Sequence, residues 1–290
     1  ARKGLRAFLA ERESRKMVAP SSMTLDQWLD YWMEQVIRPG RAETTVYGYQ
    51  KIIDNHLSPA LGAVPLQQLS PSHIQQYYTS LLRDKGLAPN TIRRHHDLLS
   101  AALHTAVRQD VPLRCPTERV EPPKVVPREV HFYGPENLKR LYALSEGTAL
   151  ELPIRLAGGL GLRREEICGH RWSSVDFHLR RIHICAARTS AGANIVEKET
   201  KNRSSTRVPH MADDLYRLLR REWSPQAENR LAAGSAWRES GLVLVDKFGA
   251  PWPPNALSLA FTRFIRRNGL PKITLHGLRH TFATVASAQG

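Results

Sequence analysis

The sequence predicts a mainly α-helical protein of two domains, the second of which also carries a small antiparallel β-sheet. Apolar residues recur every three or four positions in most segments, as they do on one face of an amphipathic helix. Short segments of alternating polarity between residues 175 and 208 are typical of strands instead. Four prolines within residues 114–127 interrupt both patterns, and they indicate a stiff linker that separates the domains.

The first domain is predicted to contain four helices with short connections, from about residue 22 to residue 112. Residues 1–19 precede it, and we expect them to form a charged helix that continues a segment upstream. The helix boundaries follow from capping residues, prolines and glycines. They are Thr24 to Pro39-Gly40, Thr44 or Thr45 to the predicted turn 58–62, Ser70-Pro71 to Gly86, and Pro89-Asn90-Thr91 to about Ala106.

The second domain is predicted to mix helices and strands, starting near Tyr133. The helices are expected from Gly134-Pro135, through the apolar segment 150–159, after Gly161, from Asp213 to Glu222, from Asn255 to Asn268, and after the cap Thr274. The strands are expected at 175–187, 195–196, 206–208 and 242–245, with residues 199–202 forming the turn of a hairpin.

Composition favours nucleic acid as the partner of this chain. The formal net charge is +15 over 290 residues, and both sides of Pro127 carry more basic than acidic residues. Arginine supplies most of this charge, and its planar fork binds phosphates. The sequence shows no basic amphipathic anchor, lipidation motif, signal peptide or membrane-length apolar run. We therefore expect a cytoplasmic, nucleoid-associated protein rather than a membrane protein.

Two further features concern metals and surface charge. The cysteines Cys115, Cys168 and Cys185 are far apart and form no C-x-x-C pair, so neither a disulfide framework nor a metal or cofactor site is expected. Basic side chains lie early in the fourth helix or just before it: Lys85, Arg93, Arg94, His95 and His96. They form either a solvated polar face or a helix that lies along a phosphate backbone.

Four basic residues form a candidate site for chemistry on phosphate. His276 and Arg279 stand three positions apart, so they project from the same face of a helix. Together with Arg163 and Lys201 they could converge on one phosphodiester. The arginines would stabilise the transition state, the lysine would protonate the leaving oxygen, and the histidine would bind a phosphate oxygen or take the proton of the nucleophile. We see no carboxylate cluster with metal spacing, so the chemistry is expected to need no metal.

These residues lie in three motifs that resemble those of the tyrosine recombinases, or phage-integrase family. Gly161-Leu162-Arg163-Arg164-Glu165-Glu166 is similar to the first arginine box, in which Glu166 would be a structural carboxylate and Arg164 a variable position. Residues 200–209, including Lys201, resemble the hairpin that carries the catalytic lysine. Leu275-His276-Gly277-Leu278-Arg279-His280-Thr281 resembles the second box.

The resemblance implies a domain organisation and a function. Residues 1–21 would be a residual linker helix, 22–118 a SAM-like core-binding domain, 119–133 the interdomain linker, and 134–290 an incomplete catalytic domain. The implied function is site-specific recombination of a mobile element at attachment sites in double-stranded DNA. It would proceed through a 3′-phosphotyrosyl intermediate in a tetramer, with possible accessory directionality or bending factors. The DNA-binding candidates are Lys85, Arg93, Arg94, His96, Arg203 and Arg207.

The chain departs from the family pattern after the second box. The family places a His or Trp and then the tyrosine nucleophile beyond this box, and neither residue occurs after Arg279 here. We expect a C-terminally truncated form that binds its site but does not cleave it. Two alternatives have different signatures: a non-catalytic DNA-binding regulator would have no reason to assemble the four basic residues, and a metal-dependent nuclease would need a carboxylate cluster.

Overall fold

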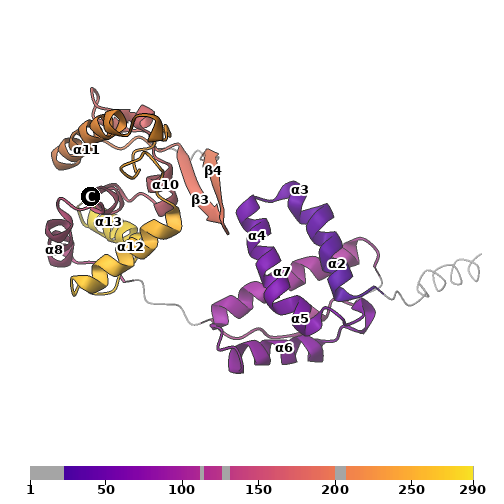
Figure 1. The fold of residues 1–290 in the computed structure, drawn as a ribbon. Coiled ribbons are helices and arrows are strands. Elements are labelled where there is room, and N and C mark those ends of the chain that lie inside the picture. Colours follow the sequence, from indigo (N-terminus) through magenta and orange to yellow (C-terminus); the bar gives the residue numbers. More distant parts are fainter. Residues whose placement is uncertain (1–22, 112–113, 126–130, 200–206, 290) are drawn as a thin grey trace, which may run out of the picture. The chain divides into compact units, whose positions relative to one another are not determined.

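A computed structural model describes residues 23–111, 114–125, 131–199 and 207–289 (Figure 1). The chain divides into two compact units, Ala1–Arg128 and Glu129–Gly290, each with a hydrophobic core of its own. The helix expected at 1–19, and the residues Lys201 and Arg203, lie outside the described residues. Within the described ranges, no helix is both long enough and apolar enough to cross a membrane.

The first unit is all-α, as predicted. Its elements are α2 (Leu25–Trp32), the π-helical turn η1 (Met33–Ile37), α3 (Arg38–Gly40), α4 (Glu43–Ile52), the π-helical turn η2 (Ile53–Leu57), α5 (Ser58–Leu61), η3 (Leu66–Gln68), α6 (Pro71–Arg83), α7 (Pro89–Arg108) and η4 (Pro116–Arg119). The predicted caps Thr24 and Ser70 both accept a hydrogen bond from the backbone three residues later. The indole of Trp28 donates to the carbonyl of Ala102 at 3.0 Å, which fastens α2 to α7.

The predicted turn at 58–62 is wrong, because the chain stays helical through Pro59. Both π-helical turns of this unit directly precede a residue–proline pair, and each closes with a bond from residue i to residue i−5, Arg38 to Met33 and Ser58 to Ile53. A proline in a regular α-helix lacks one N–H and clashes with the carbonyl four residues back. The wider π-turn shifts the hydrogen-bond register at that point, so α5 continues to Leu61.

The second unit contains six α-helices within its described residues, and these confirm the predicted helical segments. Its elements are α8 (Pro135–Ser145), α9 (Glu151–Leu160), α10 (Arg164–Gly169), η5 (Trp172–Ser174), β1 (Val175–Asp176), β2 (Arg181–Ile182), β3 (Ala186–Ala191), β4 (Asn194–Glu199), α11 (Asp213–Ala233), η6 (Gly234–Ala236), α12 (Pro254–Arg267) and α13 (Leu275–Gln289). Helix α11 continues well beyond the predicted end at Glu222. Gln226 explains the extra length, because its side chain accepts from Trp172 at 2.8 Å and donates to the carbonyl of Val243 at 2.7 Å.

The single strand predicted at 175–187 is wrong, because a tight turn divides it. The carboxylate of Asp176 accepts a hydrogen bond from the amide of Leu179, and Arg180 adopts a positive φ of 51°. The result is two separate antiparallel pairs, β1 with β2 and β3 with β4, instead of one small sheet. The β3–β4 hairpin turns at Gly192, whose φ is 66°. The turn predicted at 199–202, between the strands at 195–196 and 206–208, falls on residues of which 200–202 lie outside the described ones.

The remaining two predicted strands have different outcomes. In the segment 206–208, residue 206 lies outside the described residues, and Arg207 forms an antiparallel bridge with Ile184. In the segment 242–245, Leu242 bridges Arg171 and Val245 bridges Pro251, so no ladder forms there. The backbone of this loop bonds instead to the end of α10, where the amide of Val243 donates to the carbonyl of His170.

Helix α13 packs against α9, and buried side chains of both helices belong to the same hydrophobic core. The predicted cap Thr274 accepts from the amide of Gly277 at 3.0 Å. A Cβ atom at Gly277 would lie 3.1 Å from the carbonyl oxygen of His131, so glycine permits this close approach. The buried hydroxyl of Thr281 accepts from the amide of Tyr133 at 2.9 Å and donates to the carbonyl of Gly277.

We expect Thr281→Val to lower the free energy of unfolding of the second unit by about 1–3 kcal/mol, because the amide of Tyr133 loses its buried acceptor. Urea denaturation followed by circular dichroism measures this change. Thr284→Val is the matched control, since Thr284 is exposed on the same helix and bonds only to its own turn among its described contacts. Equal stability of the two variants would contradict the anchoring role of Thr281.

Candidate active site

The candidate site is built around the turn between α9 and α10. Helix α9 ends at Gly161 in the left-handed conformation, with φ 62°. A Cβ atom at this position would lie 2.5 Å from Cδ1 of Phe282 on α13, so a larger residue would push the two elements apart. Gly161 therefore allows α13 to approach the start of α10 closely.

A buried carboxylate holds the first predicted arginine in place. The side chain of Glu166 is only 3% exposed, although it lies on the short helix α10. It accepts a hydrogen bond from the backbone amide of Arg163 and another from Nη1 of the Arg163 guanidinium, both at 2.8 Å. The Arg163 side chain remains 44% exposed, so its guanidinium is oriented by Glu166 and still accessible to a ligand.

Arg207 supplies a second guanidinium to the same carboxylate. Its Nη2 lies 2.9 Å from Oε2 of Glu166, and its Nη1 lies 3.3 Å from Oε1. The sequence analysis gave Arg207 only as a DNA-binding candidate, and its place beside Glu166 was not predicted. The antiparallel bridge between Arg207 and Ile184 brings Arg207 there. The sequence signal for this pairing was weak, a single short segment predicted as a strand at 206–208.

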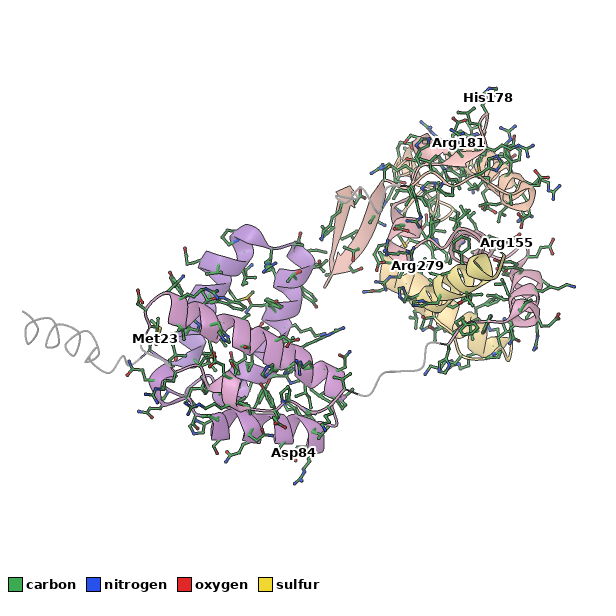
Figure 2. The ribbon with its side chains drawn as sticks, turned by 180° about the vertical axis from the view of Figure 1, so that it is seen from behind. Met23, Asp84, Arg155, His178, Arg181 and Arg279 are labelled. Carbon is green, nitrogen blue, oxygen red and sulfur yellow. The ribbon has the colours of Figure 1, made fainter. Side chains whose placement is uncertain are left out.

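Arg279 joins this group from α13 (Figure 2). Its Nη1 donates a hydrogen bond to the carbonyl oxygen of Gly161, which also accepts from Nη2 of Arg207 at 3.3 Å. Burial, followed by the positive charge of Arg163, lowers the pKa of Arg279, whereas the carboxylate of Glu166 raises it. Two guanidiniums thus bind one carboxylate and a third lies beside them, and the net positive charge suits an oxyanion such as phosphate.

His276 lies one turn before Arg279 and is exposed at the start of α13. Its ring packs edge-on against that of His280, with 4.7 Å between the ring centroids. Partial burial lowers the pKa of His276, and the nearby charges of His280, Arg279 and Arg163 lower it further. The imidazole is therefore neutral at pH 7, and it can accept a proton or a hydrogen bond.

The structure thus brings together three of the four predicted site residues: Arg163, His276 and Arg279. The fourth, Lys201, lies outside the described residues. Arg164 turns away from this group, because it pairs with Glu165 and bonds to Ser258 of α12 at 3.1 Å. Arg164 therefore links α10 to α12. The ion pair of Glu166 with Arg207 completes the site instead.

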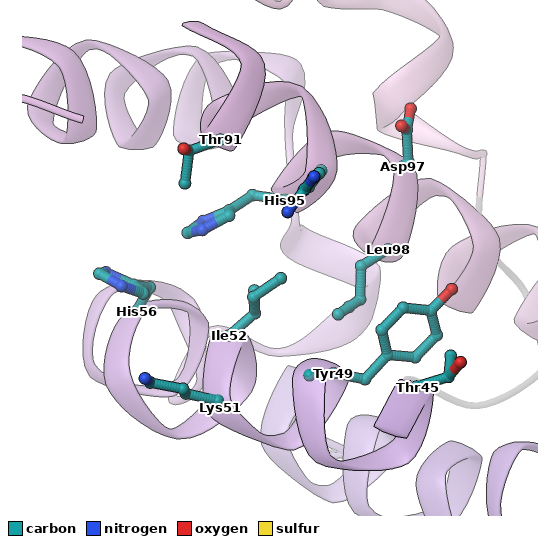
Figure 3. Close-up of a pocket in the computed structure, with 11 residues that line it drawn as sticks. Thr45, Tyr49, Lys51, Ile52, His56, Thr91, His95, Asp97 and Leu98 are labelled. Carbon is teal, nitrogen blue, oxygen red and sulfur yellow. The ribbon is translucent and has the colours of Figure 1, made fainter. Parts of the chain in front are cut away.

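The basic face of the first unit is a separate candidate for nucleic-acid contact. A shallow cavity of about 580 Å³ lies between α4 and α7, and both Arg94 and Lys51 line it (Figure 3). Arg93 and Lys85 are exposed, and Arg93 lies 3.5 Å from the carboxylate of Asp97. These exposed cations are available to a polyanion, because surface ion pairs of this kind are weak.

The two histidines of this segment face inward. His95 is almost fully buried and lies 2.7 Å from the hydroxyl of Tyr77, and burial lowers its pKa to about 4. Figure 3 shows the His95 and His56 side chains near each other at one end of the cavity, and their ring centroids are 4.9 Å apart. His96 is half-buried and bonds to the hydroxyl of Tyr78 at 2.9 Å. His95 and His96 are both neutral at pH 7, so the positive charge of this face comes from lysine and arginine.

Comparison with known proteins identifies two matching domains. Residues 24–82 match the family model of the phage integrase N-terminal SAM-like domain, and residues 132–290 match that of the phage integrase family. A tyrosine recombinase XerC-like protein of Caldanaerobacter subterraneus subsp. tengcongensis is 23% identical over 287 residues, covering 92% of this chain and 73% of the relative. An integrase of Streptomyces ambofaciens is 25% identical over 301 residues, covering 100% and 76%.

Solved structures share the fold at low sequence identity. The Tn1549 transposon integrase in complex with circular intermediate DNA aligns with a TM-score of 0.78 and 20% identity, over 93% of this chain and 88% of that one. A lambda integrase tetramer bound to a Holliday junction aligns with a TM-score of 0.66 and 18% identity, over 93% and 72%. The predicted fold class, a SAM-like helical domain followed by a mixed α/β domain of this kind, is confirmed.

We expect Glu166→Gln to lower the free energy of unfolding of the second unit by about 2 kcal/mol at pH 7, because two guanidiniums lose their charged acceptor. Burial raises the pKa of Glu166, but hydrogen bonds from Arg207 and Arg163 outweigh this and hold it below 4.5. The stabilisation is therefore complete above the pKa of the unfolded state. It disappears as the pH falls through the lowered pKa of the folded state.

Denaturant unfolding of both proteins across the acid range measures this dependence. Glu239→Gln is the control, because its ion pair with Arg230 is exposed on both sides and contributes little. A stability difference between wild type and Glu166→Gln that does not change with pH would contradict the assignment.

Proposed function

The chain belongs to the phage integrase family, and from this membership we propose that it acts in site-specific DNA recombination by metal-free phosphoryl transfer. The observation that carries the proposal is the convergence of Arg163, Arg207 and Arg279 on Glu166 and on the carbonyl of Gly161. One phosphodiester would bind beside these guanidiniums. Their fixed positive charge would stabilise the additional negative charge of the transition state, with no need for a metal ion.

Each residue has a distinct proposed role. Arg163 and Arg279 bind the non-bridging oxygens of the scissile phosphate, and Glu166 orients Arg163 through two hydrogen bonds. His276, neutral at pH 7, binds a phosphate oxygen or accepts the proton of the nucleophile. Lys201 protonates the 5′ oxygen as it leaves. Arg207 supports Glu166 and adds positive charge.

The nucleophile of this reaction is a tyrosine, which would form a 3′-phosphotyrosyl bond and release a 5′ hydroxyl. The tyrosines of the second unit have other surroundings. The hydroxyl of Tyr133 donates to the carbonyl of Pro271, and the ring of Tyr142 lies under the guanidinium of Arg155. The ring of Tyr216 packs edge-on against Phe177. We therefore expect residues 1–290 to bind DNA without cleaving it until a tyrosine is supplied.

The proposed substrate is double-stranded DNA at the attachment sites of a mobile element. The matched integrase structures include complexes with transposon DNA and a tetramer on a Holliday junction, which supports a similar assembly for an active form of this protein. Residues 22–118 would be the core-binding domain, 119–133 the linker and 134–290 the catalytic domain. The protein would act in the cytoplasm with the nucleoid, and accessory bending or directionality factors would be further partners.

A non-catalytic DNA-binding regulator is the second candidate. The surroundings of the three tyrosines favour it for the isolated chain. Strand cleavage by a protein in which a tyrosine follows residue 290, unaffected by EDTA, would separate a recombinase from both a regulator and a metal-dependent nuclease.

In such an extended protein, we expect Arg279→Ala to lower the rate of strand cleavage by about 10²–10³-fold, as the loss of one transition-state donor does elsewhere. Affinity for duplex DNA should change little, because many other phosphate contacts remain. A suicide-substrate cleavage assay and a gel-shift titration measure the two effects. Arg266→Ala is the control, since Arg266 is exposed on α12. Cleavage at the wild-type rate would exclude the proposed role of Arg279.

We also expect the affinity of the 290-residue chain for duplex DNA to fall steeply between about 50 and 200 mM salt, because bound cations release counterions from DNA. Arg94→Ala should reduce the slope of log K against log salt concentration by about one. Arg108→Ala tests the same charge loss at the opposite end of α7, away from the cavity that Arg94 lines. Equal slopes for the two variants would show that this face does not contact DNA.

A further inference from the structure

Three residues that commonly bind zinc come together in the first unit, outside the site described above. His104 lies in the second half of α7, Cys115 immediately precedes η4, and Glu118 lies within η4. One ligand atom of each residue lies within 4.8 Å of those of the other two. No metal site was expected from the sequence because these residues form no closely spaced motif, and they come together only where η4 packs against α7.

The hydrogen bonds of His104 leave one ring nitrogen available to a cation. Nδ1 lies 2.8 Å from the carbonyl oxygen of Ser100, which can only accept, so the Nδ1 proton points to this oxygen. Nε2 then carries a lone pair, and it faces Oε1 of Glu118 at 3.0 Å. A single metal ion could bind this nitrogen and this carboxylate oxygen together. A bond from Nδ1 to a backbone carbonyl is also the usual support of a metal-bound histidine.

Cys115 provides the donor that favours zinc over magnesium or calcium. Its Sγ is buried, 3.7 Å from Nδ1 of His104 and 3.1 Å from the hydroxyl of Thr117. A sulfur, a nitrogen and a carboxylate oxygen together form a donor set that selects Zn²⁺, whereas magnesium and calcium prefer oxygen alone. A thiolate and a carboxylate also neutralise the two positive charges of the ion.

The group is open to solvent on one side. The side chains of His104 and Glu118 are 40% and 62% exposed, whereas Cys115 is buried. An ion can therefore reach the site without unfolding of the unit, and the remaining coordination position would hold water.

We propose that His104, Cys115 and Glu118 bind one Zn²⁺ ion, which ties η4 to the end of α7. Its role would be structural, because the residues proposed for strand cleavage all belong to the second unit. The chain passes from the first unit to the second after η4, so the ion would fix the position from which the interdomain segment starts. Bending or unfolding of η4 away from α7 would then require loss of the metal.

The direct test uses Co²⁺ as a spectroscopic substitute for zinc in the 290-residue chain, after treatment with a chelator. We expect one equivalent to produce visible d–d bands and a near-ultraviolet thiolate-to-cobalt charge-transfer band, both abolished by one equivalent of Zn²⁺. Cys115→Ser should remove the charge-transfer band, and Glu118→Gln should weaken Co²⁺ binding about tenfold or more. Cys185→Ser is the matched control, because Cys185 is an exposed cysteine of the second unit. Absence of the band in the wild type, or its persistence in Cys115→Ser, would overturn the proposal.

Thermal unfolding gives a second measurement that does not depend on the thiolate spectrum. Zn²⁺ should raise the melting temperature of the first unit by several degrees in the wild type and in Cys185→Ser. It should have no such effect in His104→Gln, a variant that retains a polar side chain. If circular dichroism shows that His104→Gln is folded and Zn²⁺ still stabilises it equally, the ion binds elsewhere and the proposed site is wrong.

Discussion

The buried carboxylate of Glu166 is the constraint on which the rest of the candidate active site depends. An unpaired charge in this position would be very unfavourable, so folding of the second unit requires cations beside it. Arg163 comes from the same helix start and Arg207 from beyond the β3–β4 hairpin, which means that the carboxylate joins segments distant in sequence. Because the guanidiniums of Arg163 and Arg207 share this one carboxylate and that of Arg279 lies nearby, the surplus charge is positive and directed at an anion.

The carbonyl of Gly161 is the second point at which distant segments meet. It accepts from Arg207 and from Arg279, so the turn after α9 positions the second predicted arginine as well as the first. This arrangement requires α13 to pack tightly against that turn, and glycine at 161 leaves room for the Phe282 ring. The glycines of the two motifs therefore serve packing, and the basic residues beside them gain fixed positions as a result. Because these contacts join the first motif to the second, neither motif alone would indicate the site.

The sequence predicted the helices of both units well, because their caps, prolines and apolar spacing are local signals. It also predicted that Arg163, His276 and Arg279 belong together, on the basis of residue chemistry and a family resemblance. It did not predict the pairing of Arg207 with Glu166, since that depends on one backbone bridge to Ile184. The break after Asp176 and the helix through Pro59 were missed for a related reason. Each depends on a side-chain cap or a π-turn that apolar periodicity does not reveal.

A metal-free reaction and a zinc site in the same chain are compatible, because they answer different physical needs. At the proposed phosphate site, fixed guanidiniums would supply the positive charge that a metal would otherwise provide. At the end of α7 the requirement is mechanical. The 3₁₀ helix η4 has only four residues with which to hold the start of the interdomain segment against α7. The contact of His104 with Glu118 and the hydrogen bond from Thr117 to Ser100 supply part of that attachment. An ion that binds His104, Cys115 and Glu118 would strengthen this attachment at the end of α7 opposite the cavity that Arg94 lines.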